Sequence, residues 1–205
     1  MTGKPNIFSS NPPGLEKILA AKHVFVAGAG GLGSNAAMLL TRAGTGALTI
    51  VDFDKVEPSN LNRQFYFLDQ LGRPKVDALR ENLLRISPSI RITALQEKIS
   101  ESNCGKIMSG NYDLILECFD KAECKAMIAS HVLANMPDIP LITVSGLAGA
   151  GPSENLVVSR GPGRMYVIGD RVSEMNPATG TVSSRVMVAA AMQAHLGIRI
   201  LCGLE

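Results

Sequence analysis

The sequence predicts an α/β fold of the Rossmann-like, doubly wound type, with a mostly parallel sheet and antiparallel strands in the C-terminal part. Two observations predict it. Short apolar runs of strand length alternate with helical segments over residues 15–144, which is typical of parallel strands joined by crossover helices. A glycine-rich turn at residues 28–33 follows the first apolar run and precedes the first long helix, as in folds that bind nucleotides.

The size and composition indicate one domain preceded by a short arm. The chain has 205 residues, 46% of them hydrophobic, and a formal net charge of +2 with scattered lysines and arginines. This gives enough apolar surface for one core, and the lack of a basic run argues against a nucleic-acid partner. We expect residues 1–21 to form an N-terminal arm with a short helix, and residues 22–205 to form a single domain.

The sequence predicts neither a membrane protein nor a zinc protein. The first residues lack the apolar core of a signal peptide, and the apolar segment Val186–Leu201 is interrupted by Gln193, His195 and Arg199, so it is too polar to span a bilayer. The four cysteines include no C-x-x-C pair, and the three histidines lie far apart, which is unlike a zinc site. We expect a cytoplasmic protein with no membrane contact and no zinc site.

The elements up to residue 144 follow in a regular order. Gly44 and Gly46 end the first long helix, and Ser87-Pro88 stops the next, in keeping with the preferences of these residues at helix ends. The expected strands are His23–Ala27, Ala47–Val51, Ile90–Leu95, Asp113–Cys118 and Leu141–Val144, and the expected helices are Leu15–Ala21, Ser34–Ala43, Pro74–Ile86, Ser100–Met108 and Lys121–Met136.

The pattern changes after residue 150. Asn155–Ser159 and Arg164–Ile168 flank Gly161-Pro162-Gly163, which predicts an antiparallel pair of strands. Residues 169–182 form a long polar loop of the kind that carries function, and Ser183–Leu201 is the last helix.

The glycine-rich turn is the first candidate for ligand binding. Gly28, Gly30 and Gly33 fit the pattern G-x-G-x-x-G, in which glycine permits a tight turn and lets phosphate approach the free N–H groups of the next helix. By itself the motif leaves a purely structural turn open.

Asp52 lies 19 residues after Gly33, at the end of the second strand. An acid at this place can bond a ribose hydroxyl. It therefore fits NAD and ATP equally, and a turn or capping role is the alternative.

Three polar residues beyond the second strand favour a triphosphate. Asn60, Arg63 and Gln64 follow Asp52 closely, and a guanidinium suits a leaving pyrophosphate because its forked donors match phosphate oxygens. Lys75 falls in the first turn of a helix, where its charge opposes the helix dipole, so it is a second candidate for a phosphate contact. The alternatives are a solvated loop arginine and a surface lysine.

A carboxylate follows the fourth strand. Asp120 lies two residues beyond Asp113–Cys118, at the edge where open α/β sheets bind ligands, and it could hold magnesium between phosphates. The alternative is that Asp120 caps the helix beginning at Lys121. Asp54 could serve either the ribose or the metal.

Together these motifs resemble the ThiF/MoeB/ubiquitin-activating superfamily, and most of all the short ThiF sulfur-carrier adenylyltransferases. The resemblance covers residues 12–202. It is carried by residues 28–34, by Asp52-x-Asp54-x-Val56-Glu57-x-Ser59-Asn60-Leu61-Asn62-Arg63-Gln64, by Gly72-x-Pro74-Lys75 and by Glu117-x-Phe119-Asp120.

The resemblance implies a site and a reaction. Residues 22–205 become an ATP-binding adenylation domain, with residues 169–182 as its crossover loop. The implied catalytic residues are Arg63, Lys75 and Asp120, and Asp120 is the magnesium ligand. The carboxylate of a partner's C-terminal glycine attacks the α-phosphate of ATP, so that an acyl-adenylate forms and pyrophosphate leaves. The implied ATP-binding residues are Gly28, Gly30, Gly31, Gly33, Asp52, Asp54, Asn60, Arg63, Gln64 and Lys75.

The implied partner is a small ubiquitin-like carrier ending in Gly-Gly, most simply ThiS in thiamine thiazole biosynthesis. A homodimer is also implied, and the apolar stretches Leu141–Ala150 and Val186–Ala194 favour it. The alternatives are another carrier, the carboxylate of a modified tRNA base, a non-catalytic partner subunit and an NAD-dependent oxidoreductase.

The chain departs from the superfamily in three respects. It lacks the two cysteine pairs that bind zinc in longer members. It has no cysteine at residues 169–182, which suggests that its chemistry stops at the adenylate. Residues 1–41 contain no arginine, although the family often supplies one there from a second subunit.

Overall fold

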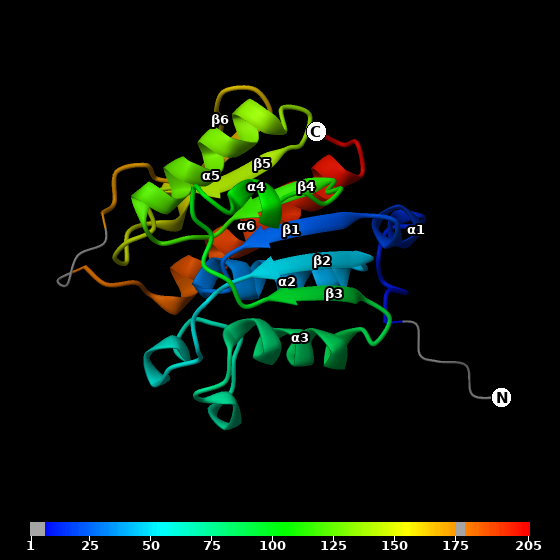
Figure 1. Cartoon of the computed structure of the whole chain (residues 1–205), viewed down its shortest axis with the longest axis horizontal. Coiled ribbons are helices and arrows are strands. Elements are labelled where there is room, and N and C mark those ends of the chain that lie inside the picture. The colour runs from blue at the N-terminus through cyan, green and yellow to red at the C-terminus, as the bar shows by residue number, and fades with distance from the viewer. Residues whose placement is uncertain (1–6, 175–178) are drawn as a thin grey trace.

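A seven-stranded sheet forms the centre of the computed structural model, which describes residues 7–174 and 179–205. The strand order is β3-β2-β1-β4-β5-β7-β6, and all neighbours are parallel except β6 and β7, which pair antiparallel (Figure 1). The strands are β1 (His23–Ala27), β2 (Ala47–Val51), β3 (Arg91–Leu95), β4 (Leu114–Glu117), β5 (Leu141–Val144), β6 (Val157–Arg160) and β7 (Met165–Gly169).

Helices cover both faces of this sheet. Figure 1 shows α4 and α5 on one face and α2 and α6 on the other. The α-helices are α1 (Leu15–Ala20), α2 (Gly31–Ala43), α3 (Lys75–Ile86), α4 (Cys104–Ile107), α5 (Ala122–Asn135) and α6 (Ser183–Leu201), and the short 3-10 helices are η1 (Pro58–Asn60), η2 (Leu68–Gln70) and η3 (Ser153–Asn155). The predicted doubly wound α/β fold is thus confirmed.

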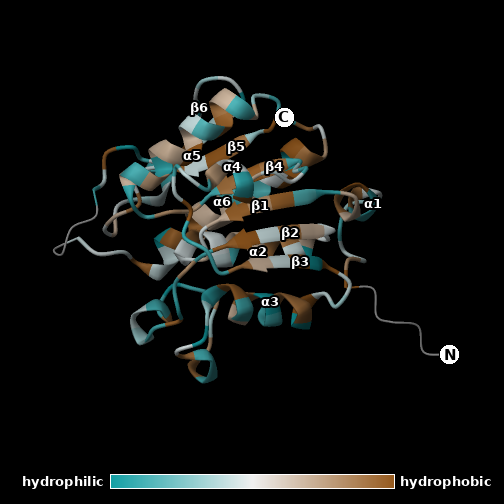
Figure 2. Cartoon of the chain, viewed as in Figure 1, coloured by the Kyte–Doolittle hydropathy of each residue, from teal (hydrophilic) through white to brown (hydrophobic). Residues whose placement is uncertain are grey.

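The apolar core has two parts, one for each face of the sheet. Alternate residues of β1 and β4 point into the two parts: Val24 and Leu116 pack on the side of α2 and α6, whereas Phe25 and Ile115 pack on the side of α4 and α5. All four side chains are fully buried, as expected of strands in a covered parallel sheet. Figure 2 shows hydrophobic colouring in the central strands and the helices around them.

The order of winding reverses between β1 and β4. The chain winds from β1 through β2 to β3, then returns to place β4 on the other side of β1 and continues to β5. In open α/β sheets, ligands bind at the carboxyl edge of the strands where the order of winding reverses. No helix in the described part of the chain is long and apolar enough to cross a membrane.

Most of the predicted elements are confirmed to within a few residues, but three details differ. Helix α2 begins at Gly31 and not at Ser34, so part of the glycine motif is helical. Helix α4 is much shorter than expected, because the Asn103 side chain accepts from the Ser100 N–H and donates to the Lys98 carbonyl, and such bonds compete with a helix. Strand β7 also pairs in parallel with β5.

Candidate nucleotide-binding site

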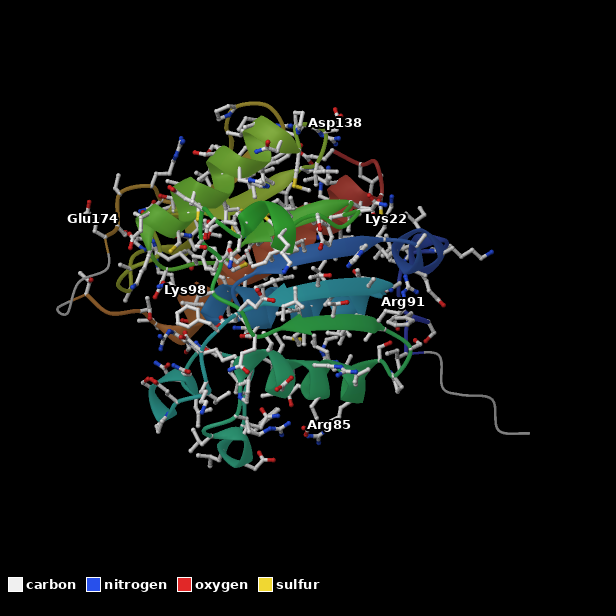
Figure 3. The ribbon with its side chains drawn as sticks, in the orientation of Figure 1. Lys22, Arg85, Arg91, Lys98, Asp138 and Glu174 are labelled. Atoms are coloured by element: carbon white, nitrogen blue, oxygen red, sulfur yellow. The ribbon has the colours of Figure 1, made fainter. Side chains whose placement is uncertain are left out.

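The candidate residues gather at the carboxyl edge of the sheet. Figure 3 shows Lys98 near this edge and Lys22 and Arg91 at the opposite ends of the strands. The loops that follow β1, β2, β4, β5 and β7 all leave from the carboxyl edge, and α6 begins there.

The glycine turn is forced by close contacts between backbones. Gly28 has a φ of +100°, and a Cβ there would lie 3.1 Å from the Cys118 carbonyl oxygen. A Cβ on Gly33 would lie 1.8 Å from the Gly28 carbonyl oxygen, so only glycine fits both positions. At Gly30, in contrast, a Cβ would meet nothing within 4 Å. The turn therefore presents an open backbone surface, which a phosphate can approach.

Asp52 holds this turn in place. One carboxylate oxygen accepts from the Ala29 N–H at 2.7 Å and the other from the Asp54 N–H at 2.8 Å. Burial raises the pKa of Asp52 above its usual value, although the two N–H bonds and the charge of Lys75 act in the opposite direction. Each oxygen retains a second lone pair, so a ribose hydroxyl could still be bound.

Three residues that the sequence reasoning did not single out fix the segment after η1 to the turn. The Tyr66 hydroxyl donates to the Ala29 carbonyl at 2.7 Å, Ser34 Oγ accepts from the Phe65 N–H at 3.0 Å, and Asn35 Nδ2 donates to the Arg63 carbonyl at 2.8 Å. Burial raises the pKa of Tyr66 well above its usual value, so it remains a donor. Ser34 and Asn35 are polar residues on the buried face of a helix, and that pattern could have indicated their role from the sequence.

Asn60 is a structural residue in this fold. It is buried, and its Oδ1 accepts from the Glu57 N–H at 3.0 Å, which caps η1. Its side-chain nitrogen lies 3.4 Å from Ser59 Oγ. An amide nitrogen has two N–H donors, and one of them faces Ser59. The predicted contact of Asn60 with phosphate would therefore use the other N–H.

Arg63 and Gln64 each have polar side-chain atoms that make no hydrogen bond to another described residue. Arg63 is half-buried, and its Nη1 donates to the Ser59 carbonyl at 2.9 Å and to Asn62 Oδ1 at 2.8 Å. Its aliphatic part passes close to Gly31, since a Cβ there would lie 3.6 Å from Arg63 Cγ. Gln64 Oε1 is buried and has no hydrogen-bond partner among the described residues. A buried acceptor without a donor is costly, so this atom fits a ligand's donor.

Lys75 is buried beside Asp54. Its Nζ lies 2.9 Å from Asp54 Oδ2, and its side chain is only 7% exposed. Its backbone N–H also bonds the Asp54 carbonyl. The ion pair explains how a lysine is tolerated in the first turn of α3, against the helix dipole. It also places the ammonium group next to the loop that carries Asp52.

Asp120 lies in the loop after β4, where the sequence predicts, and this loop passes close to the glycine turn. It follows β4, and a Cβ on Gly28 would lie 3.3 Å from a ring atom of the preceding Phe119. Asp120 is exposed and makes no hydrogen bond or ion pair with another described residue. The capping alternative is wrong, because the N-cap of α5 is Lys121 and no side chain caps that helix.

The cysteine that follows β4 is a poor nucleophile. Cys118 is buried, and its Sγ lies 3.5 Å from Gln193 Oε1. Burial, with the charge of Glu117, raises the pKa of Cys118 well above its usual value, so it stays a thiol at neutral pH. The described residues contain no group of three or more His, Cys, Asp or Glu that could hold a metal ion.

The described part of the crossover segment is anchored by a buried ion pair. Arg185 of α6 pairs with Asp170, with exposed fractions of 4% and 8%, and donates to the Gly151 and Pro152 carbonyls. Desolvation opposes the charge of Asp170, but bonds from Ser173 and Val172 and the charge of Arg185 lower its pKa to about 2. The crossover expectation itself extends over residues 175–178, which lie outside the described residues.

Comparison with known proteins identifies the family. The ThiF family profile matches residues 5–205, and the chain therefore belongs to the ThiF family, which confirms the resemblance. The chain is 33% identical over 196 residues to the sulfur carrier protein ThiS adenylyltransferase of Escherichia coli, covering 94% of this chain and 76% of that protein.

Relatives with other names also match parts of the chain. The chain is 34% identical over 134 residues to the tRNA threonylcarbamoyladenosine dehydratase of Escherichia coli, covering 65% of this chain and 49% of that protein. The crystal structure of that dehydratase with ATP superposes with a TM-score of 0.84 at 22% identity, covering 92% of this chain and 89% of that one, which shows a shared fold. The chain spans half or less of several relatives, down to 27% of a ubiquitin-like modifier-activating enzyme 5.

Proposed function

We propose that the protein is an ATP-dependent adenylyltransferase that activates a carboxylate and releases pyrophosphate. One observation carries the proposal: the loop residues Asp52, Arg63 and Asp120, and Lys75 at the start of α3, lie at the carboxyl edge around the switch point between β1 and β4. A turn with open backbone, two cations and a free carboxylate is what a triphosphate requires. Membership of the ThiF family supports the same reading.

The chemistry asks for positioning and charge neutralisation. A C-terminal carboxylate is already an anion at neutral pH, so the site needs no general base to generate the nucleophile. The α-phosphate accepts the carboxylate oxygen as the bond to the pyrophosphate oxygen breaks, and negative charge moves onto the leaving group. Arg63 and Lys75 would bind that charge through N–H donors, while Asp52 would orient the ribose.

The residues present fit magnesium bound with ATP. Magnesium is usually held by one or two carboxylates together with substrate phosphates and water, and Asp120 is an exposed carboxylate without another partner in the described structure. Asp120 would be the ligand from this chain. When bound, the ion would neutralise charge on the triphosphate.

For the acyl donor we propose a small ubiquitin-like sulfur carrier ending in Gly-Gly, with ThiS as the first candidate. The support is the ThiS adenylyltransferase relative, which matches nearly the whole of this chain. Relatives named as molybdopterin-synthase adenylyltransferases make a related carrier the nearest alternative.

A tRNA-base carboxylate is a second candidate substrate. The dehydratase named for a modified tRNA adenosine is similar in sequence and has the same fold. The scattered basic residues of this chain count against it, because tRNA binding relies on a basic surface.

The test is ATP–pyrophosphate exchange with magnesium, with and without a ThiS-like carrier. We expect exchange that depends on the carrier and disappears when its last glycine is removed. Exchange that depends on tRNA and not on any carrier would favour the second candidate. A protein that binds no ATP would refute the proposal and leave a non-catalytic partner subunit.

A further inference from the structure

A buried carboxylate that the chemistry above does not use lies at the end of β4. Glu117 is the last residue of β4 and is fully buried. Its neighbours along β4 are apolar and face the core, so a carboxylate here is costly unless it is paired. The loop after β4, strand β5 and helix α5 supply partners for it.

Hydrogen bonds reach the carboxylate from three sides. One oxygen accepts from the Phe119 N–H at 2.6 Å, and the other accepts from the Thr143 hydroxyl of β5. Lys125 of α5 contacts both oxygens, at 3.0 and 3.3 Å, with its side chain 23% exposed. The carboxylate therefore joins β4, β5 and α5.

The position of Lys125 points to a role in addition to helix stability. It lies in the first part of α5, where a positive charge opposes the helix dipole, and α5 begins without a side-chain cap. The partner that offsets this cost is Glu117, whose carboxylate Lys125 reaches from the beginning of α5.

Asp120 lies between the two points that this carboxylate holds. The Phe119 N–H is bonded on one side of Asp120 and Lys125 on the other, whereas Asp120 itself has no partner among the described residues. Its place is thus set by the backbone of the loop. On the opposite face, Gln193 of α6 donates to the Glu117 carbonyl at 3.0 Å, which fixes the strand from which the loop departs.

We propose that Glu117 and Lys125 are positioning residues that hold the loop 118–121, so that Asp120 is presented at the glycine turn. The proposal rests on the function proposed for Asp120. It assigns no contact with the substrate to either residue.

The matched variants are Glu117→Gln and Lys125→Met, with Glu123→Gln and Lys106→Met as controls at exposed positions. Glu117→Gln keeps the side-chain shape and the acceptor for Phe119 but loses the charge pairing with Lys125.

We expect each test variant to lower the kcat of carrier-dependent exchange by about tenfold or more, because small displacements of catalytic groups have large effects. We expect the KM for ATP to stay within about threefold of wild type, and Lys125→Arg to retain most of the activity.

Amide hydrogen exchange of the ligand-free protein gives a second readout that needs no activity. We expect Glu117→Gln and Lys125→Met to speed exchange in residues 118–122 only, and the controls to leave it unchanged. Unchanged amide exchange in this loop would overturn the inference. Faster exchange spread over β4, β5 and α5, together with a lower Tm, would also overturn it, because that result indicates a purely structural role. A wild-type protein without adenylation, but with locally faster exchange in the variants, would refute the proposed function and retain the loop-holding role.

Discussion

At the scale of single residues, the polar side chains around the glycine turn divide into two groups. Asp52 and Asn60 have their oxygens bonded to backbone N–H groups, so they shape the loops. Gln64 and Asp120 have polar atoms without partners in the described structure, so they are free to meet a ligand. The sequence predicts that these residues lie together, but it cannot predict the division, because amides and carboxylates serve both purposes.

Removing the Asp120 carboxylate should affect activity and not stability. Its side chain is exposed and unpaired among the described residues, so Asp120→Ala should leave the Tm unchanged. Carrier-dependent ATP–pyrophosphate exchange should fall by about 100-fold or more, since a charge-stabilising group would be lost. Thermal unfolding and the exchange assay measure the two effects, with Asp69→Ala on η2 as an exposed control. Normal turnover would show that Asp120 is not the metal ligand.

Lys75 should be important for ATP binding. Lys75→Met removes a buried ammonium next to Asp54, and we expect the affinity for ATP to fall about tenfold, as for the loss of a charge-assisted phosphate contact. Isothermal titration with ATP measures the change. Lys55→Met, at the exposed position that follows Asp54, should bind ATP as the wild type does. Equal affinities for the two variants would reject a phosphate contact by Lys75.

At the scale of elements, the glycine turn offers a direct comparison. Gly33→Ala would place a Cβ 1.8 Å from the Gly28 carbonyl oxygen, so it should lower the free energy of unfolding by about 2 kcal/mol or more. Gly30 has a φ of −80°, and a Cβ there meets nothing within 4 Å. Gly30→Ala should therefore fold normally and bind ATP less tightly. Urea unfolding measures the effect on stability, and titration with ATP measures the effect on binding. Normal ATP binding by Gly30→Ala would show that the phosphates do not lie against this turn.

The anchor of the crossover segment should be sensitive to acid. The folded-state pKa of Asp170, about 2, lies below the unfolded value of about 3.9. Its contribution to stability is therefore present above pH 4 and is lost as the pH falls towards the folded pKa. Asp170→Asn should lower the free energy of unfolding by about 2–4 kcal/mol at neutral pH, because Arg185 would lose its charged partner. Urea unfolding from pH 7 to about pH 3 should show that the difference in free energy of unfolding between the wild type and the variant becomes smaller. A difference that stays constant with pH would contradict this role of Asp170.

Helix and strand positions could be predicted because turn residues and apolar runs are local signals. Strands β1, β2 and β5 and helix α6 have the predicted bounds. Helix α4 is shorter because Asn103 bonds the backbone around it, and the 3-10 helices η1 and η2 depend on capping bonds within a few residues. Such competition between side-chain and backbone bonds is not visible in a hydrophobic pattern.

At the scale of the whole molecule, the structure removes one argument for a dimer. The apolar character of Leu141–Ala150 and Val186–Ala194 favours a homodimer, yet Ile142, Val144 and Ala190 of these stretches lie in the core of the chain itself. Local apolar character cannot tell an interface from a core, because both are apolar. In the same way, sequence could predict the sheet, but it could not predict that β7 inserts between β5 and β6.

The homodimer remains a proposal, and the structure offers another surface for it. Phe67, Leu68 and Leu71 on and beside η2 are exposed by 46%, 77% and 39%, and neighbouring exposed apolar groups often mark interfaces. We expect light scattering to give twice the chain mass at micromolar concentration, and Leu68→Glu to give the monomer. A wild-type monomer would contradict the homodimer, and a dimeric Leu68→Glu variant would exclude this surface.

Helix α6 packs on α2 and reaches β4 and β5 through Gln193, yet it follows all the strands of the sheet along the chain. During synthesis, the part of this face that α6 covers, next to β4 and β5, therefore stays exposed until residues 183–201 have emerged from the ribosome. An emerging chain with such an apolar face is prone to aggregate. The protein should thus depend on chaperones mainly in the interval between completion of β7 and docking of α6.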